Sequence, residues 1–186
     1  MGVVQGSGID ASLNDAGRKQ AQLFYHAYKD TPFEKVYTSS LKRTYESVQS
    51  FIEDGIPHES HSGLDEISWG IHEGAEASAE RNAYFNYVTT EWNSGMTATK
   101  IEGGESPEEV AERQISVVED IENSSADLIL VCMHGRAIRI LLCQLLNQPL
   151  TKMDKFAHDN LGLYILSYSD GVFSIDASNS TNHLFN

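Results

Sequence analysis

The sequence has little of what marks several classes of protein. It contains only two cysteines, Cys132 and Cys143, and both lie in apolar stretches. We therefore expect buried free thiols rather than a disulfide or a metal site. No apolar run approaches the length of a membrane span, and Met1-Gly2-Val3-Val4 does not resemble a signal peptide. A cytoplasmic protein without a membrane partner is the expectation.

Positive charge is also scarce. The 13 Lys and Arg residues are outnumbered by 27 Asp and Glu residues, so the formal net charge is −14 at pH 7. Nucleic acids and anionic membranes bind proteins through clustered cations, and this excess of acids argues against both as partners. A small anionic ligand remains compatible, because one cationic pocket can lie within an acidic surface.

The 186 residues, 40% of them apolar, suit one domain with a sizeable core. Periodicity predicts helices over 14–29 (capped by Asn14), 41–52 (capped by Ser40), around 84–92, from 106 onward behind a capping box, and over 137–146. Strands are predicted over 35–38 and 127–133, with a hairpin at 163–168 and 172–176. The alternation predicts an α/β domain with a mostly parallel sheet. The strand 127–133 is nearly all apolar, which indicates burial on both faces.

A histidine and a glycine stand where that apolar strand passes into the next helix, at His134-Gly135. In open α/β sheets, ligands bind beyond the carboxyl ends of the strands, and helix N-termini attract anions. A glycine here lets the backbone approach a phosphate closely. The pattern favours a phosphate site over the alternative, a polar turn in which His134 caps the helix.

Arg43 has a similar place, since it lies in the first helical turn after the strand 35–38. Its guanidinium can offer paired donors to phosphoryl oxygens at the same sheet edge as His134. The alternative for Arg43 alone is a solvated helix residue. Two cations at two strand-to-helix turns support a phosphate pocket more strongly than either does alone.

Three other groups are open to two interpretations. Glu66 lies between apolar residues, where poor hydration would raise its pKa and suit a general acid, but an exposed loop acid fits as well. Gln5-Gly6 begin a glycine-rich stretch that either offers backbone donors to a ligand or belongs to a loose terminus. His58, His61 and His72 lack the spacing of a zinc motif, so we expect no metal site.

Five segments, in order, resemble motifs of the histidine phosphatase superfamily, which is phosphoglycerate mutase-like in fold. They are Gln5-Gly6 with Leu13, Gly17 and Gln20-Ala21; Val36-Tyr37-Thr38-Ser39-Ser40-Leu41 with Arg43; Leu64-Asp65-Glu66 with Gly70 and Glu73-Gly74; Gly104-Glu105-Ser106 with Arg113; and Val131-Cys132-Met133-His134-Gly135 with Ile138-Arg139. The resemblance covers nearly the whole chain. It implies a three-layer α/β/α fold around a mostly parallel central sheet.

The resemblance also implies roles. Arg43 and His134 would bind the phosphoryl oxygens and neutralise their charge, and Glu66 would protonate the leaving oxygen. Substrate contacts are implied at three further positions, Gln5, Gly6 and Gly135. The family's reaction passes through a phosphohistidine and relies on cationic side chains, so neither metal nor cofactor is implied. The implied activity is hydrolysis of a small phosphomonoester, with the segment 70–104 selecting the substrate.

The chain departs from the family at its start. The family's phosphate-accepting histidine lies in an Arg-His-Gly motif ahead of the Gln-Gly segment, and here only four residues precede Gln5. We therefore expect the first strand and the nucleophile to be missing, with little or no turnover by the chain as written. A start assigned too far downstream, or a shortened protein, accounts for this best, because Arg43, Glu66 and His134 are all retained.

Three alternatives are also compatible with this start. The chain can be a pseudophosphatase that binds phosphoesters without turnover, or another histidine can act as the nucleophile. A mutase-type phosphoryl transferase is the third, although those enzymes resemble this pattern with longer insertions.

Loss of a central strand would expose two rows of unpaired backbone groups. In that case we expect a homodimer, or another segment filling the gap.

Overall fold

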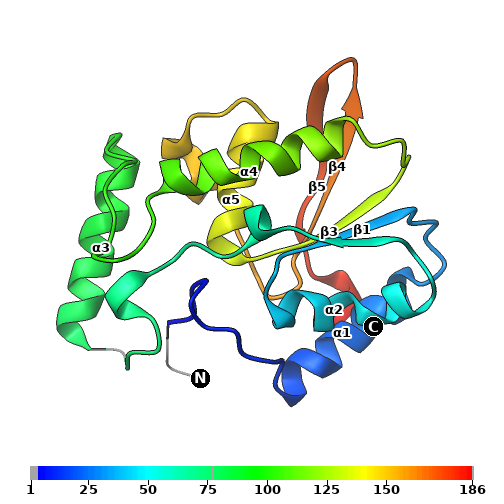
Figure 1. Ribbon diagram of the computed structural model, residues 1–186, viewed down its shortest axis with the longest axis horizontal. Helices are drawn as coiled ribbons and strands as arrows, with labels where there is room; N and C mark the ends of the chain where they lie inside the picture. Colours follow the sequence, from blue (N-terminus) through cyan, green and yellow to red (C-terminus); the bar gives the residue numbers. More distant parts are fainter. Residues whose placement is uncertain (1–3, 77, 186) are drawn as a thin grey trace.

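The computed structural model of the protein describes residues 4–76 and 78–185. Helices and strands alternate along much of this chain (Figure 1). The helices are α1 (Asp15–Tyr28), α2 (Lys42–Glu53), α3 (Ala79–Ser94), α4 (Pro107–Glu122) and α5 (Gly135–Leu145). Short 3₁₀ helices lie at Ser62–Leu64, Gly70–His72, Leu150–Lys155 and Asn182–Leu184. Each helix predicted from the sequence is present, so those predictions are confirmed.

The strands form two separate sheets. β1 (Lys35–Thr38), β2 (His58–Ser60) and β3 (Ile129–Cys132) make a parallel sheet in the order β2-β1-β3. β4 (Leu163–Ser169) and β5 (Val172–Ser180) make an antiparallel hairpin that turns at Asp170-Gly171, as predicted. β2 is a finding that the sequence does not predict, because this short polar strand has no apolar alternation.

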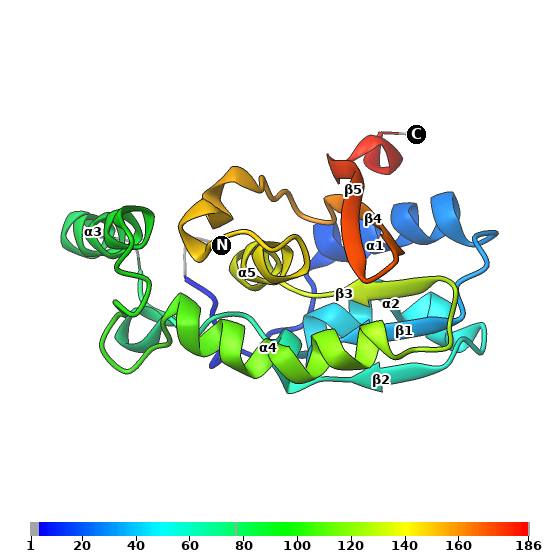
Figure 2. The ribbon, with the colours of Figure 1, turned by 90° about the horizontal axis from the view of Figure 1, so that it is seen from above.

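Helices cover both faces of the parallel sheet (Figures 1 and 2). One core cluster joins α1 and α2 to the sheet through Phe24, Val36, Val48, Phe51 and Leu130. A second cluster joins α4 and α5 to the opposite face through Tyr37, Leu64, Val117, Leu141 and Leu145. Successive residues of β1 therefore enter different clusters, as the pleat of a strand requires. The predicted three-layer α/β architecture is confirmed.

The burial of β3 differs from the prediction. Leu130 is buried, whereas Ile129, Val131 and Cys132 are only half-buried. β3 is the edge strand of its sheet, with β1 as its paired neighbour in the described chain. An all-apolar strand of this kind is typical of a central position, so its edge position explains the incomplete burial.

The helix caps match the predictions with one exception. The Asn14 side chain accepts a hydrogen bond from Gly17 N at 2.8 Å, and Ser106 begins α4 with a complete capping box. Ser40 does not cap α2, whose N-cap is Leu41. The Ser40 backbone N–H and hydroxyl both donate to the Asp65 carboxylate, so its side chain is directed away from the helix.

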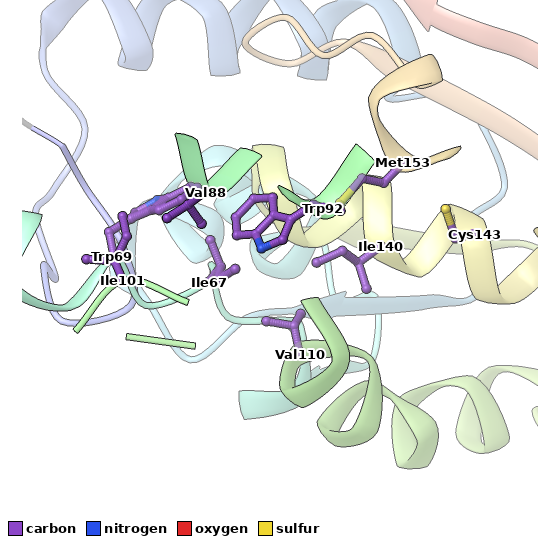
Figure 3. Packing of buried hydrophobic residues seen from close by; sticks show 9 residues of the cluster. All are labelled: Ile67, Trp69, Val88, Trp92, Ile101, Val110, Ile140, Cys143 and Met153. Carbon is purple, nitrogen blue, oxygen red and sulfur yellow. The ribbon is translucent and has the colours of Figure 1, made fainter. Parts of the chain in front are cut away.

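A third core cluster lies between α3, α4 and α5 (Figure 3). It contains Ile67, Trp69, Val88, Trp92, Ile101, Val110, Ile140, Cys143 and Met153. Ile67 is fully buried there, which anchors the segment that carries the neighbouring Glu66. Cys132 and Cys143 are free thiols, as predicted, but Cys143 is buried and Cys132 only half-buried. Among the described helices, none combines the length and the apolar composition that a membrane crossing needs.

Candidate active site

A cavity of about 640 Å³ opens where β1 and β3 end and α2 and α5 begin. Its walls also include the start of α1 and the segment after β2. Five residues predicted from the sequence lie in its lining: Gln5, Arg43, Glu66, His134 and Gly135. Gly6 lies behind this lining, where its carbonyl oxygen accepts a hydrogen bond from Arg43. The fold thus gathers the predicted residues, while their roles remain predictions.

His134 is almost fully buried, with 6% of its surface exposed. Arg43 Nε lies 3.1 Å from His134 Nδ1, and because a guanidinium nitrogen can only donate, Nδ1 must carry the lone pair. The imidazole proton therefore resides on Nε2, which donates to Ser39 Oγ at 2.7 Å. Burial, reinforced by the positive charge of Arg43, lowers the pKa of His134 to about 3. In this arrangement His134 is neutral at pH 7, and it can supply positive charge only if an arriving anion raises that pKa.

Arg43 projects into the cavity from the first turn of α2. Its Nη1 donates to Ile9 O at 2.6 Å and its Nη2 to Gly6 O at 3.3 Å. With the bond to His134, three of the five guanidinium N–H groups are used, which leaves two for a ligand. Burial lowers the pKa of Arg43, an effect opposed by the nearby Glu66, but arginine stays charged in proteins.

The Glu66 carboxyl group is buried against the start of α5, with 8% of the residue exposed. Its Oε1 accepts from Ile67 N and Ala137 N, both at 2.9 Å, and its Oε2 accepts from Arg136 N at 3.1 Å. The helix N-terminus that the sequence offers to a phosphate therefore holds this side chain. Burial raises the pKa of Glu66 even though the three N–H donors act in the opposite direction. A carboxyl with a raised pKa at a cavity wall can hold and release a proton.

Arg113 fixes the segment that carries this acid. From α4, its guanidinium donates to the carbonyl oxygens of Gly63, Asp65 and Glu66 at 2.7–3.1 Å. It also forms a salt bridge with Glu105 at 2.9 Å. Arg113 is thus a positioning residue, since it holds the backbone on both sides of Glu66 without lining the cavity itself.

Two polar residues near His134 are not predicted as site residues from the sequence. Ser39 is 2% exposed and links His134 to Leu41 N and the Thr44 hydroxyl, at 3.1 and 2.8 Å. Its place in a strand-to-helix turn was an available signal. His158 lines the cavity beside His134. No local pattern marks it, because only the fold brings the segment after α5 to this point.

The remaining histidines have other surroundings. His58 is bonded to Thr38 Oγ1 at 2.9 Å, and His61 lies 2.8 Å from a carboxylate oxygen of Asp120. Throughout residues 4–76 and 78–185, no three His, Cys, Asp or Glu side chains are grouped so as to hold a metal ion. The cavity lining contains no described residue from 70–104, so a role of that segment in substrate selection stays a prediction.

A cation, an imidazole and a buried acid at the ends of parallel strands form a site suited to phosphate chemistry. The model of the histidine phosphatase superfamily (branch 1) matches residues 2–181, and the chain belongs to this family. It is 25% identical over 178 residues to phosphoserine phosphatase 1 of Hydrogenobacter thermophilus, covering 95% of this chain and 84% of that protein.

Solved structures of other phosphatases share the fold of this chain. A mycobacterial glucosyl-3-phosphoglycerate phosphatase, in complex with inorganic phosphate, superposes with a TM-score of 0.84 at 23% identity. The match covers 97% of this chain and 92% of that one. A phosphoserine phosphatase of Entamoeba histolytica, in complex with 3-phosphoglyceric acid, gives a TM-score of 0.81 at 24% identity, covering 98% and 91%.

Proposed function

We propose that this protein is a phosphomonoesterase acting on a small phosphorylated substrate in the cytoplasm. The observation that carries the proposal is the convergence of Arg43, Glu66 and His134 on one cavity. Each of the three side chains supplies something different that phosphoryl transfer needs. Arg43 supplies a fixed positive charge, His134 an imidazole in contact with that charge, and Glu66 a buried acid. The names of the similar proteins, which are phosphatases of small phosphorylated compounds, support the same activity.

The geometry suggests how a phosphoryl group would be held. The two N–H groups of Arg43 not engaged by protein would bind two of its oxygens. A dianion next to His134 offsets the charge of Arg43 and raises the pKa of the imidazole. Because Nδ1 accepts from Arg43 and Nε2 donates to Ser39, His134 would donate to the phosphoryl group only after one of these two bonds opens. Protonated Glu66 would then give its proton to the leaving oxygen, which avoids release of an alkoxide.

The rate at which the 186-residue chain can hydrolyse a phosphomonoester depends on whether it has a nucleophile. The sequence contains no Arg-His-Gly triplet, and we assign His134 to the second catalytic position of the family rather than to the nucleophile. We expect this chain to bind phosphate and to hydrolyse phosphomonoesters slowly or not at all. The same observation favours a second candidate function, a pseudophosphatase that binds phosphoesters without turning them over.

One experiment separates these functions. Binding of orthovanadate and of inorganic phosphate is measured by calorimetry, and turnover of p-nitrophenyl phosphate is measured on the same preparation. Saturable binding with slow turnover that His134→Ala abolishes supports the enzyme. Binding with no turnover supports the pseudophosphatase, and failure to bind either anion would contradict both.

We also propose that the outer edge of β3 pairs with a further strand, either from a second copy of the chain or from another segment. The support is an all-apolar strand in an edge position, together with a β4–β5 hairpin that forms its own sheet. Light scattering on the 186-residue chain is expected to give the mass of a dimer. A monomer whose β3 amide protons exchange as slowly as those of β1 would argue against pairing between chains.

A further inference from the structure

We propose that His158 is a ligand-contacting residue of this cavity, whose Nε2 donates a hydrogen bond to the phosphoryl group held by Arg43 and is protonated as that group binds. The inference rests on the proposed phosphate site and extends it by a second imidazole. No motif in the sequence assigns His158 a role.

The ring of His158 lies directly against the start of α5. A Cβ atom placed on Gly135 would lie 2.8 Å from its Cδ2 and 3.2 Å from its Nε2, closer than side chains normally approach. Gly135 therefore does more than open space for a ligand, because its missing side chain admits the Nε2 edge of His158. This edge faces the turn that presents His134, and both histidines line the same cavity.

The segment that carries His158 is fixed on both sides by the hairpin. The Tyr164 hydroxyl of β4 donates to Ala157 O at 2.5 Å. The Asn179 side chain of β5 accepts from Asp159 N at 3.0 Å and donates to the Asp159 carboxylate at 2.8 Å. Residues on both sides of the histidine are thus held by side chains from two strands. This support keeps the imidazole in one position, as a residue of a preformed binding site requires.

The polar atoms of the ring fit a role that needs a ligand. Nδ1 is buried and has no hydrogen-bond partner among the described residues, so a ligand would reach the ring at Nε2, whose edge lies against Gly135. Burial, followed by the positive charge of Arg139 on α5, lowers the pKa of His158, while Asp159 on its own segment acts in the opposite direction.

Four further titratable groups share the cavity with this ring: His134, Arg43, Glu66 and Cys132, whose thiol stays neutral because burial raises its pKa to about 12. Arg43 is cationic, so its charge disfavours a second cation nearby. His134 is neutral at pH 7, so it does not stabilise one. A bound dianion reverses this balance, because its charges lie beside Nε2 and offset those of Arg43 and Arg139. Binding of the dianion and protonation of His158 are therefore coupled.

The test uses sulfate, which stays a dianion between pH 4 and 8, so that all proton uptake belongs to the protein. The imidazole resonances of the 186-residue chain are titrated by NMR with and without saturating sulfate. We expect the titration midpoint of His158 to rise by about one pH unit when sulfate is bound, which by linkage equals a tenfold preference of sulfate for the protonated ring. His158→Gln should accordingly weaken sulfate binding as the pH falls through the measured bound-state midpoint of His158, by about tenfold once the pH lies below the free-state midpoint.

His183 provides the matched control, since it is also buried and packs against Phe24, away from the cavity lining. Within residues 4–76 and 78–185, neither of its ring nitrogens has a hydrogen-bond partner. His183→Gln should leave sulfate affinity unchanged. If sulfate binds the wild-type chain and Arg43→Ala weakens it, but the His158 midpoint does not move, this inference fails while the proposed function stands. If sulfate and phosphate both fail to bind the wild-type chain, the proposed function fails first. The midpoint is read on the wild-type protein, so a poorly folded His158→Gln would not obscure the result.

Discussion

Replacing Arg43 with alanine is expected to weaken phosphate binding by at least about a hundredfold. The two N–H groups not used within the protein would each form a charge-assisted hydrogen bond, worth about 1.5–3 kcal/mol. Their joint loss of about 3 kcal/mol or more corresponds to a factor of a hundred or greater in Kd. The substitution also removes the donor to His134 Nδ1, which frees that imidazole to change its tautomer. Isothermal titration with phosphate measures the change.

Two further variants show whether the weaker phosphate binding comes from the pocket or from net charge. Arg43→Lys keeps the charge but loses the planar fork, so it should fall between alanine and the wild type. Arg81→Ala removes the same charge from an exposed position on α3, and its phosphate affinity should match that of the wild type. Equal weakening by Arg81→Ala and Arg43→Ala would indicate a general effect of net charge, which the proposed pocket does not allow.

Glu66→Gln is expected to move binding and turnover in opposite directions. At a pH above the raised pKa of Glu66, the ionised carboxylate repels a phosphate dianion in the same cavity, so removing its charge should tighten binding about tenfold. The advantage should shrink as the pH falls, because burial raises the pKa of Glu66 and the wild-type carboxyl therefore takes up its proton at a higher pH than an ordinary glutamate. Any slow turnover should fall about a hundredfold, since the leaving oxygen loses its proton donor.

Stability needs a separate measurement for this variant. A pKa raised by folding means that the native state binds the proton more tightly, so Glu66 makes the fold less stable as pH rises above about 4.5 until the folded pKa is passed. Glu66→Gln should remove that contribution, but its amide nitrogen would face a backbone N–H donor at Arg136 or Ala137. Thermal unfolding at pH 5 and pH 9 separates these effects. Glu102→Gln, at an exposed acid, is the charge-matched control and should change neither binding nor its pH dependence.

Much of the fold is predictable because its signals are local. The capping box at Ser106 with Glu109, the side-chain cap at Asn14 and the Asp170-Gly171 turn are each set by a few adjacent residues. The periodicity of apolar residues then fixes the faces that pack together. Ser40 shows the limit of such reasoning, since a distant partner, Asp65, competes for its hydroxyl and leaves α2 without the expected cap.

The site was predictable as a set of residues but not as an arrangement. Arg43 and His134 could be placed at one sheet edge because both follow parallel strands. Nothing local indicates that Glu66 accepts hydrogen bonds from the first N–H groups of α5, or that Ser39 accepts one from His134, because these contacts join segments far apart in sequence. His158 enters the cavity only through the path of the chain after α5, so its place follows from the fold alone.

The most direct test of the phosphoryl-binding site is a crystal structure of this chain with orthovanadate. We expect vanadate in the cavity at the ends of β1 and β3, with oxygens within hydrogen-bonding distance of the Arg43 guanidinium and the His134 imidazole, and with Glu66 still bonded to the start of α5. Vanadate bound at any other surface, or an ordered cavity that stays empty at saturating vanadate, would contradict the central claim that these residues form a phosphoryl-binding site.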